Sequence, residues 1–343
     1  MARNAPKCSS VGCFRDAVAR SPHNGVPLCE VCLRRYIGGN LRDYSSQPAR
    51  KIPNKALSVE IECFAPNQDS FVAATHVGFA CSDGSLPNFG CEFKLVGHRD
   101  KMPQVAARFL NRLSSIRMQV NNKCGLHVGV DLRHLPPMRR FMVTQWLRKY
   151  QAEFYKLVPR SRRVNRYCFP LRYGFDWEKE AMRTVFGDRF MDVVGPMYRD
   201  TANSTCYSNI ISRNSYSGWA EHACVFNEAK PGRLEVRLHP GSVNPHKVRA
   251  WLDIWRQFQT HWESTPEFEG SESAILWSNS LQPCNIAPDD MPDWFKNLPH
   301  PVDMLTGIGR EYWNARISNG GILPVKVTTA NALANGDDSY GDD

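Results

Sequence analysis

The sequence predicts an α+β fold: a mostly antiparallel sheet with helices packed on one face, preceded by a small N-terminal zinc module. Three observations support this prediction. Several short segments alternate apolar and polar residues, as strands with one buried face do. Longer segments between and after them repeat apolar residues at helical spacing. Four cysteines stand in two close pairs ahead of the first alternating segment.

The N-terminal module comprises residues 1–42. Its C-x4-C and C-x2-C pairs can close a tetrahedral zinc site, and so short a segment has too little core to fold without such a metal. Four protein ligands would leave the zinc no open position, so we expect a structural role. Unrelated buried thiols are the alternative. The expected ligands are Cys8, Cys13, Cys29 and Cys32.

The rest of the chain divides by composition. Residues 43–56 contain two prolines and few apolar residues, which predicts a linker. We expect the second domain over residues 57–325. Residues 326–343 end in NGDDSYGDD and are expected to form an acidic, disordered tail.

Composition indicates a globular protein that works in a reducing compartment. The chain of 343 residues is 42% hydrophobic, enough for a large core. No apolar run approaches the roughly 18 residues of a membrane span, and residues 1–10 lack the apolar core of a secretory signal. Twelve cysteines in such a chain favour thiols or metal ligands over disulfides. We therefore expect a cytoplasmic protein without membrane contact.

Charge is unevenly distributed along the chain, whose formal net charge is +9. Lys and Arg outnumber Asp and Glu most clearly in residues 1–55 and 133–173. A basic surface suits nucleic acid, nucleotide or an acidic substrate, and it also suits plain solubility.

Residues 58–64, SVEIECF, predict the first strand of the second domain. Apolar residues alternate with Glu60 and Glu62, so the two carboxylates share one face. Carboxylates about 7 Å apart on one strand face repel each other unless positive charge lies between them. Taken alone, this segment also fits a half-exposed strand with a solvated acidic face.

Three later segments repeat the alternation, namely residues 91–96, 124–133 and 232–241. Each combines an apolar face with a polar one. The polar faces carry Glu92, Lys94, His127, Gly129, Asp131, Glu235, Arg237 and His239.

Three segments predict helices. The first covers residues 103–119, and a long second helix opens at Pro136 and Pro137 and ends before residue 159. In the third, Asn244 is placed as the N-cap and Pro245 at the first helical position. Beyond about residue 264 we expect Pro-rich loops and short helices, and residues 205–212 predict a weak strand.

The polar faces of the four strands share one chemistry. Carboxylates, an imidazole and a guanidinium that meet on one sheet face would repel one another unless divalent cations joined them. Oxygen ligands with few nitrogens suit Mg²⁺ or Mn²⁺ rather than zinc. Such a cation typically also binds substrate phosphates, and a nearby arginine would neutralise a phosphoryl group during transfer.

The order of these motifs closely resembles the amidoligase family, which is often phage-associated and is similar in fold to glutamine synthetases and glutamate–cysteine ligases. The resemblance covers roughly residues 57–262. It comprises the Glu-x-Glu strand, the SDGSL segment, GLHV, RSRRVNRYCFP and the spacing E-x-R-x-x-x-G-x-x-N-P. It implies a sheet of the glutamine-synthetase type and, for a viral chain, the cytoplasm of the host.

The resemblance also implies roles for individual residues. Glu60 and Glu62 would each supply a carboxylate to one of two Mg²⁺ or Mn²⁺ sites, and Glu92 would join one of these metals. The other metal would take His127 and Glu235. Arg237 would contact the transferring phosphate.

Two departures from the family pattern leave further candidates. Gly129 stands where many relatives have a second histidine, and one acidic ligand is missing, for which Asp83 and Asp131 are candidates. Asp131 is also a candidate for the base. The basic loop after the second helix could bind ATP phosphates or an acidic substrate, or could simply be solvated. Its candidates are Arg160, Arg162, Arg163 and Arg166, of which we select Arg163 and Arg166.

The implied reaction is ATP- and Mg²⁺-dependent formation of an amide or isopeptide bond through an acyl phosphate. The carboxylate and amine partners would belong to a peptide, a protein or a small amino compound. The alternatives are a zinc-containing protein that binds nucleic acid through its basic regions, and a ligase whose substrate is attached to nucleic acid. Phosphoryl transfer to a guanidinium also occurs on related folds, but GLHV favours the ligases.

Overall fold

The fold is known from a computed structural model of the chain. It describes residues 19–20, 27–28, 53–77, 80–81, 86, 89–163, 165, 168, 183–185, 187, 225–230, 232–264 and 293–320. The zinc ligands expected in the N-terminal module lie outside the described residues, as do the acidic tail and the strand expected at residues 205–212.

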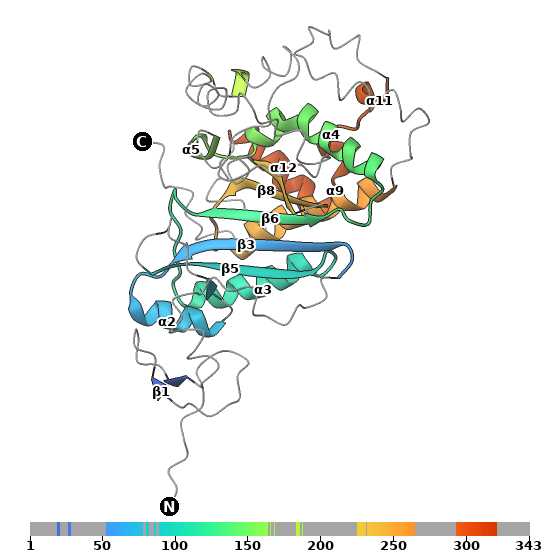
Figure 1. The fold of residues 1–343 in the computed structure, drawn as a ribbon. Helices are drawn as coiled ribbons and strands as arrows, with labels where there is room; N and C mark the ends of the chain where they lie inside the picture. The colour runs from blue at the N-terminus through green and yellow to red at the C-terminus, as the bar shows by residue number, and fades with distance from the viewer. Residues whose placement is uncertain are drawn as a thin grey trace, which may run out of the picture.

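The centre of the second domain is a six-stranded sheet in the order β4-β5-β3-β6-β8-β7, with every neighbouring pair antiparallel (Figure 1). The predicted α+β class and the antiparallel sheet are therefore confirmed. Four long strands match the four alternating segments of the sequence. Their bounds are β3 Ala56–Phe64, β5 Gly90–His98, β6 Gly125–Asp131 and β8 Arg233–Pro240, and the edge strands are β4 Ala80–Cys81 and β7 Phe226–Lys230.

The apolar and polar side chains of these strands lie on opposite faces of the sheet, as the alternation predicts. On β3 the apolar residues Val59, Ile61 and Cys63 are fully buried, whereas Glu60 lies on the opposite face and is partly exposed. The apolar residues of β6 are buried in the same way. One face of the sheet therefore belongs to the core, and the other carries the polar groups.

Helices cover the apolar face. Helix α3, Met102–Ser115, and helix α9, Pro245–Ser264, contact each other and lie behind the strands in Figure 1. Helix α12, Gly307–Ser318, packs on α9. The remaining elements are α2 Gln68–Val77, α4 Pro137–Lys156, α5 Arg160–Arg163, α11 Asp293–Lys296 and the 3₁₀ helix η5 Pro301–Met304.

Aromatic side chains join α4 to α9. Trp146 of α4 lies edge-on to Phe258 of α9, with ring centres 4.9 Å apart, and Phe154 stacks on Trp255. Edge-to-face and offset-stacked pairs are favourable arrangements for such rings. These aromatic side chains of the two helices therefore form part of the core.

The start of α9 is set locally by the sequence. The side-chain oxygen of Asn244 accepts hydrogen bonds from the backbone N–H groups of His246 and Lys247, at 3.0 and 3.1 Å. Two amides that the helix leaves unpaired thus receive a partner, and Pro245 lacks an N–H that would need one. The predicted N-cap is confirmed.

A β-bulge changes one predicted face. Leu126 faces His239 and Val128 faces Val236, so β8 has one residue more than β6 in this stretch. His239 consequently turns toward the helices, where its Nε2 lies 2.8 Å from the hydroxyl of Tyr312. The prediction that His239 shares a face with the other polar residues of β8 was wrong.

In the N-terminal module, the described residues form a short antiparallel hairpin of β1, Ala19–Arg20, and β2, Pro27–Leu28. None of the described helices is both long and apolar enough to cross a membrane.

Candidate metal centre

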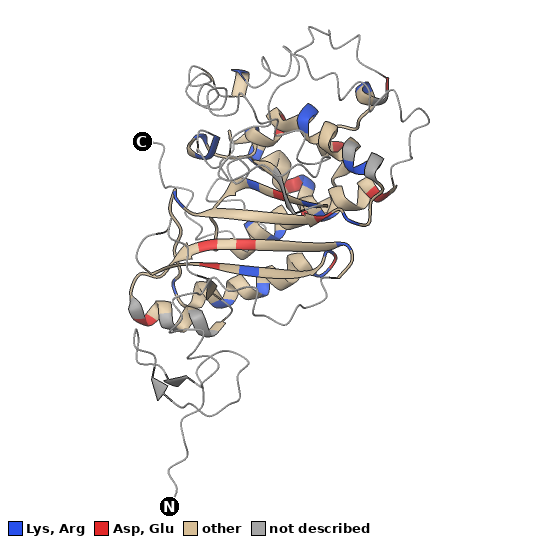
Figure 2. Ribbon diagram, viewed as in Figure 1, with Lys and Arg blue, Asp and Glu red and all other residues tan. Residues whose placement is uncertain are grey.

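The register of the central strands brings the polar residues together. Glu60 of β3 lies opposite Lys94 of β5 on one side and opposite His127 of β6 on the other. Glu62 lies opposite Glu92. Figure 2 shows the resulting arrangement, with acidic positions on β3 and β5 beside a basic position on β5.

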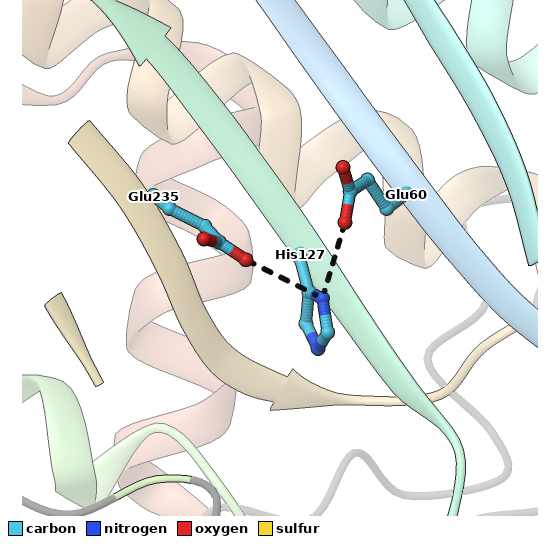
Figure 3. Close-up of side chains that lie close together, drawn as sticks. All are labelled: Glu60, His127 and Glu235. Atoms are coloured by element: carbon cyan, nitrogen blue, oxygen red, sulfur yellow. Dashed lines mark ion pairs between the residues drawn. The ribbon is translucent and has the colours of Figure 1, made fainter. Parts of the chain in front are cut away.

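Three of the predicted ligands form a compact group (Figure 3). Nδ1 of His127 lies 3.5 Å from Oε2 of Glu60 and 3.7 Å from Oε1 of Glu235. One ligand atom from each residue lies within 4.8 Å of the other two. We call Glu60, His127 and Glu235 the triad. It draws on three different strands, so its assembly depends on how β3, β6 and β8 pair.

The triad has the properties of a cation site. Nδ1 of His127 is buried and, within the described part of the chain, has no hydrogen-bond partner of ordinary geometry. A buried polar atom without a partner is uncommon in proteins and often marks a site for a missing ligand. Two carboxylate oxygens and one imidazole nitrogen are ordinary ligands for a divalent metal. The residues therefore fit such an ion.

Lys94 supplies positive charge between two of the glutamates. Its Nζ lies 2.9 Å from Oε1 of Glu60 and 2.8 Å from Oε1 of Glu92. Lys94 was not among the predicted site residues, although it stands two residues after Glu92 and therefore on the same strand face.

The ionisation of these residues follows from their surroundings. Burial and repulsion from Glu60 raise the pKa of Glu92 to about 7, against the attraction of Lys94. Burial would also raise the pKa of Glu60, but His127 and Lys94 outweigh it and hold that pKa well below its usual range. Burial would lower the pKa of Lys94, but Glu60 and Glu92 hold it above its ordinary value.

Glu62 lies on the other side of the imidazole. Its Oε1 is 3.5 Å from Nε2 of His127, and its Oε2 accepts a hydrogen bond of 2.6 Å from the backbone N–H of Gly125. The side chain is thus fixed at one oxygen and orients the ring with the other. The structure places Glu62 as a residue that orients His127 and leaves it outside the triad.

Arg237 joins the same face from β8. Its guanidinium donates a hydrogen bond of 2.7 Å to Oε1 of Glu235, the oxygen that also faces His127. Glu235 and Arg237 therefore lie side by side on one strand face, as the alternation predicts.

The basic segment contributes a different arginine from those selected. Arg162 is buried and donates hydrogen bonds to the carbonyls of Arg237, at 2.7 Å, and Leu238, at 3.3 Å. Arg163 donates instead to the carbonyls of Val158 and Gly320. The structure thus brings Arg162 to the border of the site and turns Arg163 to other backbone segments. The charge pattern of the sequence could not show which of several neighbouring arginines on this short helix lies near the site.

Asp131 lies away from the triad. It stands four residues beyond His127 on β6, or about 13 Å along the strand. Its carboxylate accepts hydrogen bonds from the guanidinium of Arg133, at 2.7 and 3.1 Å. Burial would raise the pKa of Asp131, but these bonds lower it. Arg166 and Asp83 lie outside the described residues.

Comparison with known proteins adds no assignment. No family model matches the sequence, and no curated protein matches it significantly.

Proposed function

We propose that the protein is an ATP- and Mg²⁺-dependent carboxylate–amine ligase that forms an amide or isopeptide bond. One observation carries the proposal: Glu60, His127 and Glu235 bring their ligand atoms within 4.8 Å of one another on the polar face of an antiparallel sheet. The order of motifs resembles the amidoligase family, and this resemblance indicates the reaction that the three residues would serve.

The triad would hold the divalent cation. Its mixed set of two carboxylates and one imidazole suits Mn²⁺ as well as Mg²⁺. When bound, the cation would polarise the phosphate oxygens of ATP and neutralise their charge. Glu62 keeps the imidazole oriented through Nε2, so that Nδ1 stays directed at the two carboxylates.

Arg237 would bind a phosphate oxygen. One terminal nitrogen is taken by Glu235, while Nε is buried and, among the described residues, has no hydrogen-bond partner. A guanidinium has five N–H donors, so Arg237 can hold Glu235 and still bind an anion. We assign it to the γ-phosphate, where its charge would stabilise the transferring group.

The reaction proceeds in two displacements. A substrate carboxylate oxygen attacks the γ-phosphorus of ATP, the bond to the β-phosphate oxygen breaks, and ADP leaves. The amine nitrogen of the second substrate then attacks the acyl carbon, phosphate leaves and the nitrogen loses a proton. The side chains contribute by positioning these groups and by balancing charge. The substrates we propose are a carboxylate and an amine on peptides, proteins or small amino compounds.

The nucleic-acid alternative depends on how many cations of residues 133–173 remain available. Several already serve inside the fold. Lys149 donates to the carbonyls of Phe295 and Lys296, and Arg148 and Arg162 are buried. Fewer cations of this stretch are therefore available to bind phosphates than its net charge suggests, and we favour the ligase.

The test is nucleotide turnover by the purified full-length chain. With Mg²⁺ or Mn²⁺ and ATP, a screen of carboxylates against amines should yield ADP and phosphate only when both partners are present. Glu235→Gln should abolish this turnover, whereas Glu311→Gln, at an exposed position on α12, should not. Release of AMP, or full turnover in a folded Glu235→Gln protein, would contradict the proposal.

A further inference from the structure

The ammonium of Lys94 lies between the carboxylates of Glu60 and Glu92, in contact with one oxygen of each. We propose that Lys94 is a built-in cation that takes the place of a second divalent ion. The polar face would then hold a single metal, at the triad, instead of the two expected from sequence. This inference rests on the proposed function only in taking the triad as a metal site.

The two oxygens of Glu60 face two different partners. Its Oε1 faces the ammonium of Lys94 at 2.9 Å, whereas its Oε2 faces Nδ1 of His127. In a site with two metals, one carboxylate commonly bridges the ions in this way. Here one of the two oxygens, Oε1, is already paired with a cation that belongs to the chain, the ammonium of Lys94.

The strand register holds this cation in place. Lys94 lies directly opposite Glu60 across the β3–β5 pair, and Glu92 precedes it by two residues on the same face. Cross-strand neighbours and residues two apart on one strand are the positions whose side chains meet. Both contacts are ion pairs, with N–O distances of 2.9 and 2.8 Å.

Charge balance on this face also favours one ion. Four glutamates, at positions 60, 62, 92 and 235, face the cations Lys94 and Arg237, and the buried guanidinium of Arg162 lies at the border of this face. When all of these groups are ionised, one negative charge remains, or two if Arg162 is left out of the count, so a single divalent ion is enough to neutralise the face. A second ion at Glu92 would lie beside the ammonium and be repelled by it.

The experiment counts Mn²⁺ ions bound to the full-length chain, by electron paramagnetic resonance of free Mn²⁺ without nucleotide. Wild type should bind one ion that is lost in His127→Ala. Lys94→Met, which removes the charge but keeps most of the length, should bind one ion more than wild type. Lys94→Arg should keep the wild-type number, because the charge remains.

Two further variants localise the effect. Lys123→Met removes an exposed lysine in the turn before β6 and should leave the number of ions unchanged. Adding Glu92→Gln to Lys94→Met should remove the extra ion, because the second site would lose a ligand. Differences between variants cancel any ions bound elsewhere on the chain.

The inference is overturned if wild type binds two ions that depend on the polar face, a result that needs no Lys94 variant to fold. It is also overturned if folded Lys94→Met, checked by circular dichroism, gains no ion. Failure of the ligase proposal would look different: the predicted ion counts would be found, but ATP would not be turned over with any carboxylate and amine.

Discussion

Nδ1 of His127 lies 3.5 Å from Oε2 of Glu60, the residue directly opposite it on the neighbouring strand. That separation is long for a strong hydrogen bond but suits two ligands of one ion. Glu62 orients the other side of the ring, and Glu235 completes the group from β8.

Replacing the imidazole should weaken metal binding. In His127→Ala one of the three ligand atoms of the triad is lost, and we expect the affinity for Mn²⁺ to fall by at least about ten-fold. His98→Ala is the matched control, since this histidine is partly exposed and pairs with Asp100. Isothermal titration of both variants with Mn²⁺ provides the comparison. Equal affinities would remove His127 from the site.

A single methyl group at Gly125 should disturb the site without altering a ligand. A Cβ at this position would lie 2.6 Å from Nε2 of His127 and 2.9 Å from Nη2 of Arg162, so both side chains must move. We expect Gly125→Ala to lower Mn²⁺ affinity by about ten-fold or more, in the range found when groups that orient a ligand are changed.

Gly97→Ala is the control for this substitution. There the new Cβ would lie 3.4 Å from the sulfur of Met102, close to ordinary contact. If Gly125→Ala binds Mn²⁺ as tightly as Gly97→Ala, the ring of His127 has more freedom than the structure indicates.

The buried guanidinium of Arg162 should matter for stability. It bonds the carbonyls of Arg237 and Leu238, which lie at the bulge of β8, and Arg162→Met would leave them without that donor. We expect the free energy of unfolding to fall by about 2–4 kcal/mol, measured by urea denaturation. Arg160→Met, at an exposed position of the same short helix, should change it little. Equal effects of the two substitutions would contradict this role.

Glu92 should give the protein a specific dependence on pH. Its folded-state pKa of about 7 lies above the ordinary value of 4.5, so folding favours the protonated form. The resulting stabilisation is complete below pH 4.5 and is lost as pH rises through 7, by at most about 3 kcal/mol. With a chelator present, the stability of Glu92→Gln should therefore decline less than that of wild type between pH 4.5 and 7.

The control for the pH experiment is Glu311→Gln, whose carboxylate is lost from an exposed position. Its thermal unfolding midpoint should follow the wild-type dependence on pH. A Glu92→Gln profile parallel to wild type would show that Glu92 titrates normally. Glu60 acts in the opposite sense, because its lowered pKa stabilises the fold above pH 4.5 and this effect is lost toward acid.

Local pattern was enough to predict the main elements of the second domain. Period-two alternation identified four strands and assigned Glu60 and Glu62 to one face. Asn244 and Pro245 marked the start of α9 correctly. These features depend on neighbours within a few residues of the chain, which is why one sequence sufficed.

Tertiary structure decided which polar groups meet. Strand order and register place Lys94 against Glu60, and they join His127 to Glu235 from strands separated by about a hundred residues of chain. The bulge of β8 exists only through its pairing with β6, and it turns His239 toward the helices. The sequence by itself therefore determined the faces of the strands, whereas the pairing of distant strands determined the site, because cross-strand contacts depend on register that no local pattern contains.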